Sequence, residues 1–279
     1  MAWLGAALAD QAAPAPAPAD ALGPVERALA AGKHLRIDGP RGPIHVWIPP
    51  GYQPDTAATV LYVHGYWDTV DSAWAGHRLA EQFALGALNA LVIAPEAPSG
   101  PRVPVNYPRL AELLQLVEAE AGVVRGAAWT VAIGHSGAYR TLESWLDEPV
   151  LDQLVMVDAQ YGDEAPIVRW LTASDRRRLI MVGQDTVLGT ESVASALGDV
   201  LTLDRFPPSY DTWPAEARDA RVVYVRAQYG HMPLVTEGIV LPSLLRLVPV
   251  PRLPDLPWQL PLGPLPPPPD AARPDASVP

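Results

Sequence analysis

A serine in a short run of small residues is the strongest candidate for chemistry in this chain. Residues 134–138 read Gly-His-Ser-Gly-Ala, and they follow the apolar run 129–133 and precede a helical pattern. A serine on such a sharp strand-to-helix turn has a strained backbone, so the positions two before and two after it must be small. Gly134 and Ala138 meet that need. The pattern predicts that Ser136 is a nucleophile, against the alternative of an ordinary helix N-cap.

A serine nucleophile needs a general base, and that base needs a carboxylate to fix its tautomer. His231 follows the strand-like run 222–225 and is the only histidine downstream of residue 135. Asp185 follows the run 179–182, and Asp158 ends the preceding run, 154–157. We predict His231 as the base and Asp185 as the acid, with Asp158 as the alternative acid. A histidine at a helix start without a role is the other interpretation of His231.

An earlier strand-like run, 60–63, ends in a histidine and a glycine. Negative charge develops on a substrate carbonyl oxygen only in the transition state, and a loop at this position can aim a backbone N–H at it. We expect the N–H groups of Gly137 and Tyr66 to form this oxyanion hole, with His64 orienting the loop. Three further side chains are expected to line the substrate pocket: Trp67, His135 and Glu96. The alternatives are that Glu96 is a solvated loop carboxylate and that Trp67 packs as an ordinary core aromatic.

Alternating apolar runs and helical patterns must position these residues. The runs are rich in β-branched residues and almost continuously hydrophobic, as strands buried on both faces are. Eight strands are predicted, at residues 35–38, 44–48, 59–63, 90–94, 129–133, 154–157, 179–182 and 222–225. The first two are expected to pair antiparallel across a Gly-Pro turn. The helical patterns between the others predict a mostly parallel sheet with helices on both faces.

The order Ser136, Asp185, His231 resembles the triad order of the α/β-hydrolase family, and residues 34–248 are similar to its core. The Pro-Pro-Gly-Tyr turn at 49–52 resembles esterase-like and peptidase-like bacterial members. The resemblance implies an α/β-hydrolase fold with an eight-stranded, mostly parallel sheet. Only about 17 residues separate Tyr161 from the run at 179, which leaves no room for a large cap domain.

The resemblance further implies a serine hydrolase that cleaves a carboxylic ester, or a related acyl bond, through an acyl-enzyme. A peptidase or amidase of the same fold and a non-catalytic binding protein are the alternatives. The expected partner is a small-molecule ester or amide, and no cofactor is needed. No metal is expected either, because Asp68, Asp71 and His77 lack a recognised ligand spacing.

Composition limits the other classes of function. The 279 residues contain no cysteine, which excludes a disulfide framework, a thiolate zinc site and a cysteine nucleophile. The formal net charge of −11 makes a nucleic-acid partner improbable. Apolar runs are much shorter than the roughly 20 residues of a membrane-spanning helix, so no span is expected. The oligomeric state cannot be predicted from these features.

Proline-rich and alanine-rich sequence at both ends predicts three parts. We expect an Ala/Pro-rich segment over 1–24, an α/β-hydrolase domain over 25–248 and a Pro-rich disordered tail over 249–279. Residues 1–9 resemble the end of a signal peptide with a small-x-small cleavage site. An extracytoplasmic protein maturing near Asp10 is one hypothesis, and an apolar N-terminus without such a role in a cytoplasmic protein is the other.

Residues 186–221 form the longest connection between predicted strands, and they contain several aromatic residues and prolines, including Phe206 and Trp213. Two interpretations stay open for this stretch. It folds as a lid with an aromatic wall, or its rings pack against the sheet.

Overall fold

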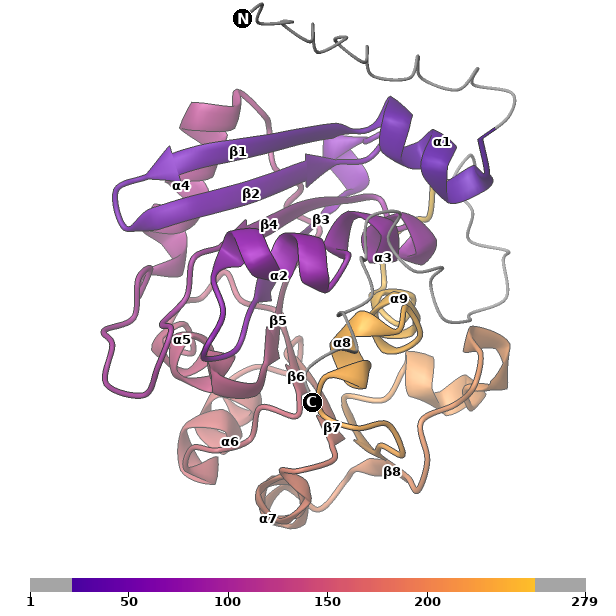
Figure 1. Cartoon of the computed structure of the whole chain (residues 1–279). Coiled ribbons are helices and arrows are strands. Elements are labelled where there is room, and N and C mark those ends of the chain that lie inside the picture. The colour runs from indigo at the N-terminus through magenta and orange to yellow at the C-terminus, as the bar shows by residue number, and fades with distance from the viewer. Residues whose placement is uncertain (1–21, 254–279) are drawn as a thin grey trace, which may run out of the picture.

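A nine-stranded sheet runs through the computed structural model, which describes residues 22–253 (Figure 1). The predicted terminal segments lie largely outside the described residues, including the signal-peptide-like residues 1–9. The strands, in chain order, are β1 (Lys33–Gly39), β2 (Gly42–Ile48), β3 (Ala58–Val63), β4 (Ala90–Pro95), β5 (Trp129–His135), β6 (Gln153–Val157), β7 (Arg178–Gly183), β8 (Leu201–Leu203) and β9 (Val222–Arg226).

Nine α-helices accompany the sheet within the described part of the chain. They are α1 (Pro24–Ala31), α2 (Val70–Gly76), α3 (Leu79–Gly86), α4 (Leu110–Ala121), α5 (Tyr139–Ser144), α6 (Glu164–Thr172), α7 (Val187–Leu197), α8 (Pro233–Thr236) and α9 (Val240–Leu245). Four short 3-10 turns join them: η2 (Pro54–Thr56), η3 (Ser136–Ala138), η4 (Tyr210–Thr212) and η5 (Ala215–Arg218).

The strand order is β1-β2-β4-β3-β5-β6-β7-β9-β8. β2 pairs antiparallel with β1 and with β4, and all other neighbours are parallel. The antiparallel opening pair and the mostly parallel sheet are therefore confirmed. All eight predicted strands are present, and the ninth, β8, was not predicted. β8 has only three residues and lies at the sheet edge, so it lacks the long buried apolar run that marks the others.

Two apolar cores lie on the two faces of the sheet, because side chains of successive strand residues point to opposite faces. Along β3, Val60 and Tyr62 belong to one core, while Leu61 and Val63 belong to the other. The first core is covered by α1, α2, α3, α8 and α9, and the second by α4, α5, α6 and α7 (Figure 1). Continuous hydrophobicity in the sequence thus follows from burial on both faces.

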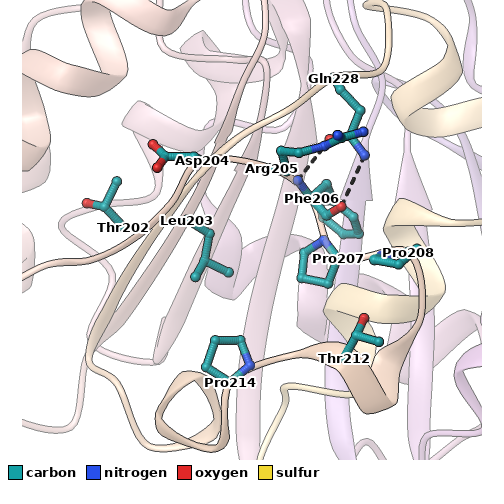
Figure 2. A pocket seen from close by; sticks show the side chains of 10 residues that line it. All are labelled: Thr202, Leu203, Asp204, Arg205, Phe206, Pro207, Pro208, Thr212, Pro214 and Gln228. Atoms are coloured by element: carbon teal, nitrogen blue, oxygen red, sulfur yellow. Dashed lines mark hydrogen bonds between the residues drawn. The ribbon is translucent and has the colours of Figure 1, made fainter.

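The long connection between β7 and β9 is not a lid. It forms α7, the edge strand β8 and two 3-10 turns, and its rings Phe206 and Trp213 are buried in the first core. Figure 2 shows a pocket beside β8, where the Gln228 side chain bonds the backbone N–H and carbonyl of Phe206. The packing interpretation of this stretch is therefore the one that the structure supports.

No helix within residues 22–253 has both the length and the apolar character needed to cross a bilayer. Between β6 and β7 the only helix is α6, so no cap domain is inserted there.

Candidate active site

Four of the predicted site residues meet at one edge of the sheet. Ser136 follows β5, Asp158 follows β6, Asp185 lies just beyond β7, and His231 lies beyond β9. These four strands are consecutive neighbours in the sheet and run parallel. Their carboxyl ends therefore lie side by side, which brings residues far apart in the sequence to one place.

The turn at Ser136 has the strained geometry that the sequence predicted. Ser136 has a φ of +54°, between the extended end of β5 and the turn η3. A β-carbon on Gly134 would lie 2.5 Å from Cδ1 of Leu142, and one on Gly137 would lie 2.4 Å from the ring of Tyr66. Positive φ costs a non-glycine residue about 1–3 kcal/mol and is found most often at functional sites.

A third glycine, Gly65, makes room for the serine from the other side. A β-carbon there would lie 2.8 Å from Cβ of Ser136 and 3.2 Å from the carbonyl oxygen of His135. The loop after β3 therefore packs directly against the serine turn, and only a glycine allows that approach.

His231 is hydrogen bonded to Asp158, with 2.6 Å between Nδ1 and Oδ2. Asp158 is fully buried, and both its oxygens accept further bonds from backbone N–H groups. The donors are the N–H groups of Gln184, Asp185 and Thr186 and the hydroxyl of Thr186. Burial by itself raises the pKa of Asp158, but the bonds from His231 and the three N–H groups outweigh it and leave the pKa well below its usual range. Asp158 is therefore a carboxylate.

Asp185, which the sequence favoured as the acid, stands further from the histidine. Its Oδ2 lies 3.8 Å from Nδ1 of His231, and 55% of its side chain is exposed. The turn after β7 directs its backbone N–H, not its side chain, toward the buried site, where it donates to Asp158. The geometry thus favours the alternative acid, Asp158.

The pKa of His231 is raised, first by its hydrogen bond to Asp158. Partial burial opposes this effect, and the charges of Asp158 and Asp185 add to it. A ring held in this way carries its hydrogen on Nδ1, which leaves Nε2 as the acceptor that a general base requires.

His135 lies beneath His231, with 4.5 Å between the ring centroids. Its Nε2 lies 3.2 Å from the carbonyl oxygen of His231, which can only accept, so Nε2–H donates. Burial, together with the neighbouring His231 and His77, lowers the pKa of His135 to about 3. His135 is therefore a neutral support of the His231 backbone. The sequence had placed it in the substrate pocket.

The loop after β3 is held by His64 and Glu96. Nδ1 of His64 lies 2.8 Å from the carbonyl oxygen of Gly65 and therefore donates to it, while Nε2 accepts the N–H of Ala97 at 3.0 Å and lies 3.0 Å from Oε1 of Glu96. The other oxygen of Glu96 accepts the N–H of Val70, 3.2 Å away, at the start of α2. The carboxylate of Glu96 thus bonds the start of α2 and lies against His64 of the loop after β3, although the sequence assigned it to substrate.

The Gly65–Tyr66 peptide group is oriented by this arrangement. In a trans peptide the N–H points opposite to the carbonyl, so fixing the Gly65 carbonyl also fixes the Tyr66 N–H. Neither this N–H nor that of Gly137 has a partner among the backbone hydrogen bonds of residues 22–253. Tyr66 and Gly137 also lie in contact, since the Tyr66 ring covers Gly137. Two adjacent unbonded N–H groups beside a serine can accommodate an oxyanion.

Trp67 follows with a φ of +67°, and its backbone N–H donates to the carbonyl of Ser99 at 3.0 Å. Its side chain is 84% exposed. The structure therefore places it on the outer surface of the site and not in the core.

Sequence reasoning did not single out Tyr161, which lies three residues past Asp158. Burial raises the pKa of its phenol, as do Asp158 and Asp185, while a hydrogen bond with Ser136 lowers it. Tyr161 thus reaches the serine itself. Its position at the carboxyl end of β6 was the signal that could have identified it.

Asp158, Asp185 and His231 are also the residues best placed to hold a cation, with ligand atoms within 4.8 Å of one another. The oxygens of Asp158 already accept five hydrogen bonds, so a cation here would compete with His231. Of the earlier metal candidates, Asp68 and His77 lie 3.7 Å apart, while Asp71 pairs with Arg36 and His45 instead.

A tight serine turn after the fifth strand, a histidine after the last long strand and this strand order are the features of an α/β-hydrolase fold. No family model and no curated protein matches the sequence significantly. Among solved structures, the chain is similar to one described as FAE, with 14% identity and a TM-score of 0.52 over 84% of this chain and 94% of that chain. At this identity the likeness concerns the fold, and it confirms the fold that the sequence predicted.

Further similar structures are described as esterases and serine hydrolases. One is a fluorophosphonate-binding serine hydrolase of Staphylococcus aureus, with 13% identity and a TM-score of 0.47 over 72% of this chain and 91% of that chain. Another is an esterase of Pyrobaculum calidifontis, with 11% identity and a TM-score of 0.46 over 80% of this chain and 85% of that chain.

Proposed function

We propose that this protein is a serine hydrolase that cleaves carboxylic esters through an acyl-enzyme. The observation that carries the proposal is the buried Asp158 bonded at 2.6 Å to His231, beside a serine held at positive φ. A buried carboxylate, an imidazole and a strained serine on adjacent strand ends have no evident structural purpose, and strain of this kind is typical of active sites.

In the proposed reaction, Oγ of Ser136 attacks the ester carbonyl carbon while its proton passes to Nε2 of His231. The electron pair of the C=O bond moves to the carbonyl oxygen, which accepts hydrogen bonds from the N–H groups of Gly137 and Tyr66. Asp158 stabilises the imidazolium that forms. The intermediate then collapses, the C–O bond to the alcohol breaks, and His231 returns its proton to the leaving oxygen.

Water completes the cycle by the same steps. It attacks the acyl-enzyme carbonyl as His231 takes one of its protons, and the acid leaves as Ser136 regains its hydrogen. Loss of either oxyanion donor is expected to slow turnover by about 100-fold to 1,000-fold.

Labelling with a fluorophosphonate probe, which reacts with activated serines, tests the proposal. We expect the wild type to be labelled and to hydrolyse p-nitrophenyl acetate, and Ser136→Ala to do neither. Ser144→Ala is the matched control, because Ser144 lies on α5 and bonds only the carbonyl of Thr141. A correctly folded wild type that neither labels nor turns over the ester would refute the proposal and favour a non-catalytic binding protein.

A further inference from the structure

Exposed apolar side chains are concentrated at the edge of the sheet that carries Ser136. Six large apolar residues are exposed within residues 22–253, and five of them follow the parallel strands β3, β4, β6, β7 and β9. These five, called the apolar rim below, are Trp67, Val103, Tyr161, Leu188 and Met232. The sixth, Val124, lies in the connection from α4 to β5, at the opposite edge. A grouping of this kind marks a binding surface, while single exposed apolar residues are ordinary.

One half of the rim is tied to the helix that follows the serine. Arg140, four residues after Ser136, donates to the carbonyls of Pro101 and Val103 at 2.9 and 2.8 Å. A β-carbon on Gly100 would touch the Trp67 ring at 3.8 Å. The Val103 loop therefore contacts both the Trp67 side chain and the serine helix.

The other half is tied to the serine, the acid and the base. Tyr161 lies close enough to Ser136, Asp158 and Asp185 for them to shift its pKa, and Met232 directly follows His231. Leu188, 83% exposed, precedes Gly189, where a β-carbon would lie 2.6 Å from the carbonyl oxygen of Gln160. Leu188 is thereby placed beside the Tyr161 loop. Both halves of the rim thus border the candidate site.

Charges of both signs lie at this edge. Asp158 and Asp185 lie inside the rim, and the chain as a whole carries a formal net charge of −11. Against them stand Arg102 and Arg140 of the same edge, and Arg140 is engaged by loop carbonyls. The net negative charge of the chain disfavours the approach of an anionic group, so an uncharged substrate is favoured.

We propose that the apolar rim binds the non-reacting part of the substrate, and that the preferred substrates are uncharged esters with a large apolar acyl group. This inference rests on the proposed ester hydrolysis. In this proposal the rim binds single dissolved ester molecules and not the surface of an ester aggregate. An acyl chain that extends from Ser136 across the rim would bury Leu188 and Trp67 side-chain surface that is otherwise exposed to water.

The test compares p-nitrophenyl octanoate with p-nitrophenyl acetate, and the readout is the ratio of their kcat/KM values. We expect the wild type to prefer octanoate, and Leu188→Ser to lower the ratio about fivefold to tenfold, as partial loss of one buried leucine would. Val124→Ser is the matched control, an exposed apolar residue at the opposite edge, and should leave the ratio unchanged. An octanoate analogue ending in a carboxylate should be a poorer substrate than octanoate.

The outcomes separate the two proposals. If acetate is hydrolysed but the ratio is the same in Leu188→Ser and the wild type, the rim inference is wrong and the hydrolase proposal stands. If octanoate is hydrolysed well only above the concentration at which it aggregates, the rim binds an interface, which overturns the assignment to single molecules. If the wild type neither labels with fluorophosphonate nor hydrolyses any ester, the proposed function itself fails.

Discussion

Replacing Asp158 with asparagine keeps the volume of the side chain and removes the charge that faces His231. Three donors converge on Oδ1 of Asp158, which are the N–H groups of Gln184 and Thr186 and the Thr186 hydroxyl. The amide oxygen of an asparagine would therefore take the place of Oδ1, because the amide nitrogen cannot accept from them. The NH2 group would then occupy the position of Oδ2, facing Nδ1 of His231.

The consequence is the wrong tautomer of the base. An amide that donates to Nδ1 leaves the ring hydrogen on Nε2, which can then no longer take the serine proton. In serine hydrolases with such a triad, the equivalent change lowers kcat by about 10,000-fold, and we expect a loss of about 1,000-fold to 10,000-fold here. Asp185→Asn is the matched comparison. Its carboxylate is half exposed and 3.8 Å away, so its loss should cost no more than about fivefold.

Both variants are assayed by kcat on p-nitrophenyl acetate at pH 8 and by the rate of fluorophosphonate labelling, with circular dichroism to confirm the fold. The acidic limb of the pH profile gives a second readout. The base must be neutral, so the kcat/KM of the wild type increases as the pH is raised through the raised pKa of His231. In Asp158→Asn the histidine loses the partner that raises its pKa, so the acidic limb of the residual activity should lie at a lower pH than in the wild type. Asp185→Asn losing as much activity as Asp158→Asn would refute the assignment of the acid.

Three further predictions concern stability and the loop after β3. Burial holds the pKa values of His77 and His135 at about 4 and about 3 in the folded protein. In the unfolded chain both histidines take up a proton near pH 6.5, so the free energy of unfolding decreases as the pH drops below 6.5. Urea unfolding should show a loss on the order of 4 kcal/mol between pH 8 and pH 5, and equal stability at both would contradict the burial argument. Glu96→Ala should lower kcat about tenfold with little change in KM, because the loop after β3 loses the side chain that holds His64 against α2, and a change in KM alone would contradict this. Gly65→Ala should slow fluorophosphonate labelling about 100-fold, since its β-carbon would displace Ser136. Unchanged labelling would show that the loop after β3 moves aside and leaves Ser136 in place.

The sheet could be predicted because its signal is local. Six of the nine strands are continuous apolar runs, and burial on both faces makes each one visible in the sequence without knowledge of its neighbours. The one strand that was not predicted, β8, pairs only with β9 and is three residues long. Its existence depends on its pairing with β9, as between Leu201 and Val223, and a local pattern does not report a partner so far along the chain.

The serine turn was equally accessible to sequence reasoning. Gly134 is small because a β-carbon there would meet the side chains of Leu142 and Ala138, which lie within the next eight residues of the chain. Gly65 contributes to the same packing from a distant loop. Its contact with Ser136 becomes apparent only when β3 and β5 lie side by side in the sheet.

The sequence by itself determined the fold class and a short set of candidate residues, because strand burial and the serine turn impose local requirements. The tertiary structure decided which carboxylate faces His231, where Glu96 and His135 point, and that Tyr161 reaches Ser136. Both aspartates follow a strand at the same edge, and the strand ends alone do not distinguish them. The difference arises because the turn after β7 directs three N–H groups onto Asp158, and such a contact exists only between segments that the fold brings together.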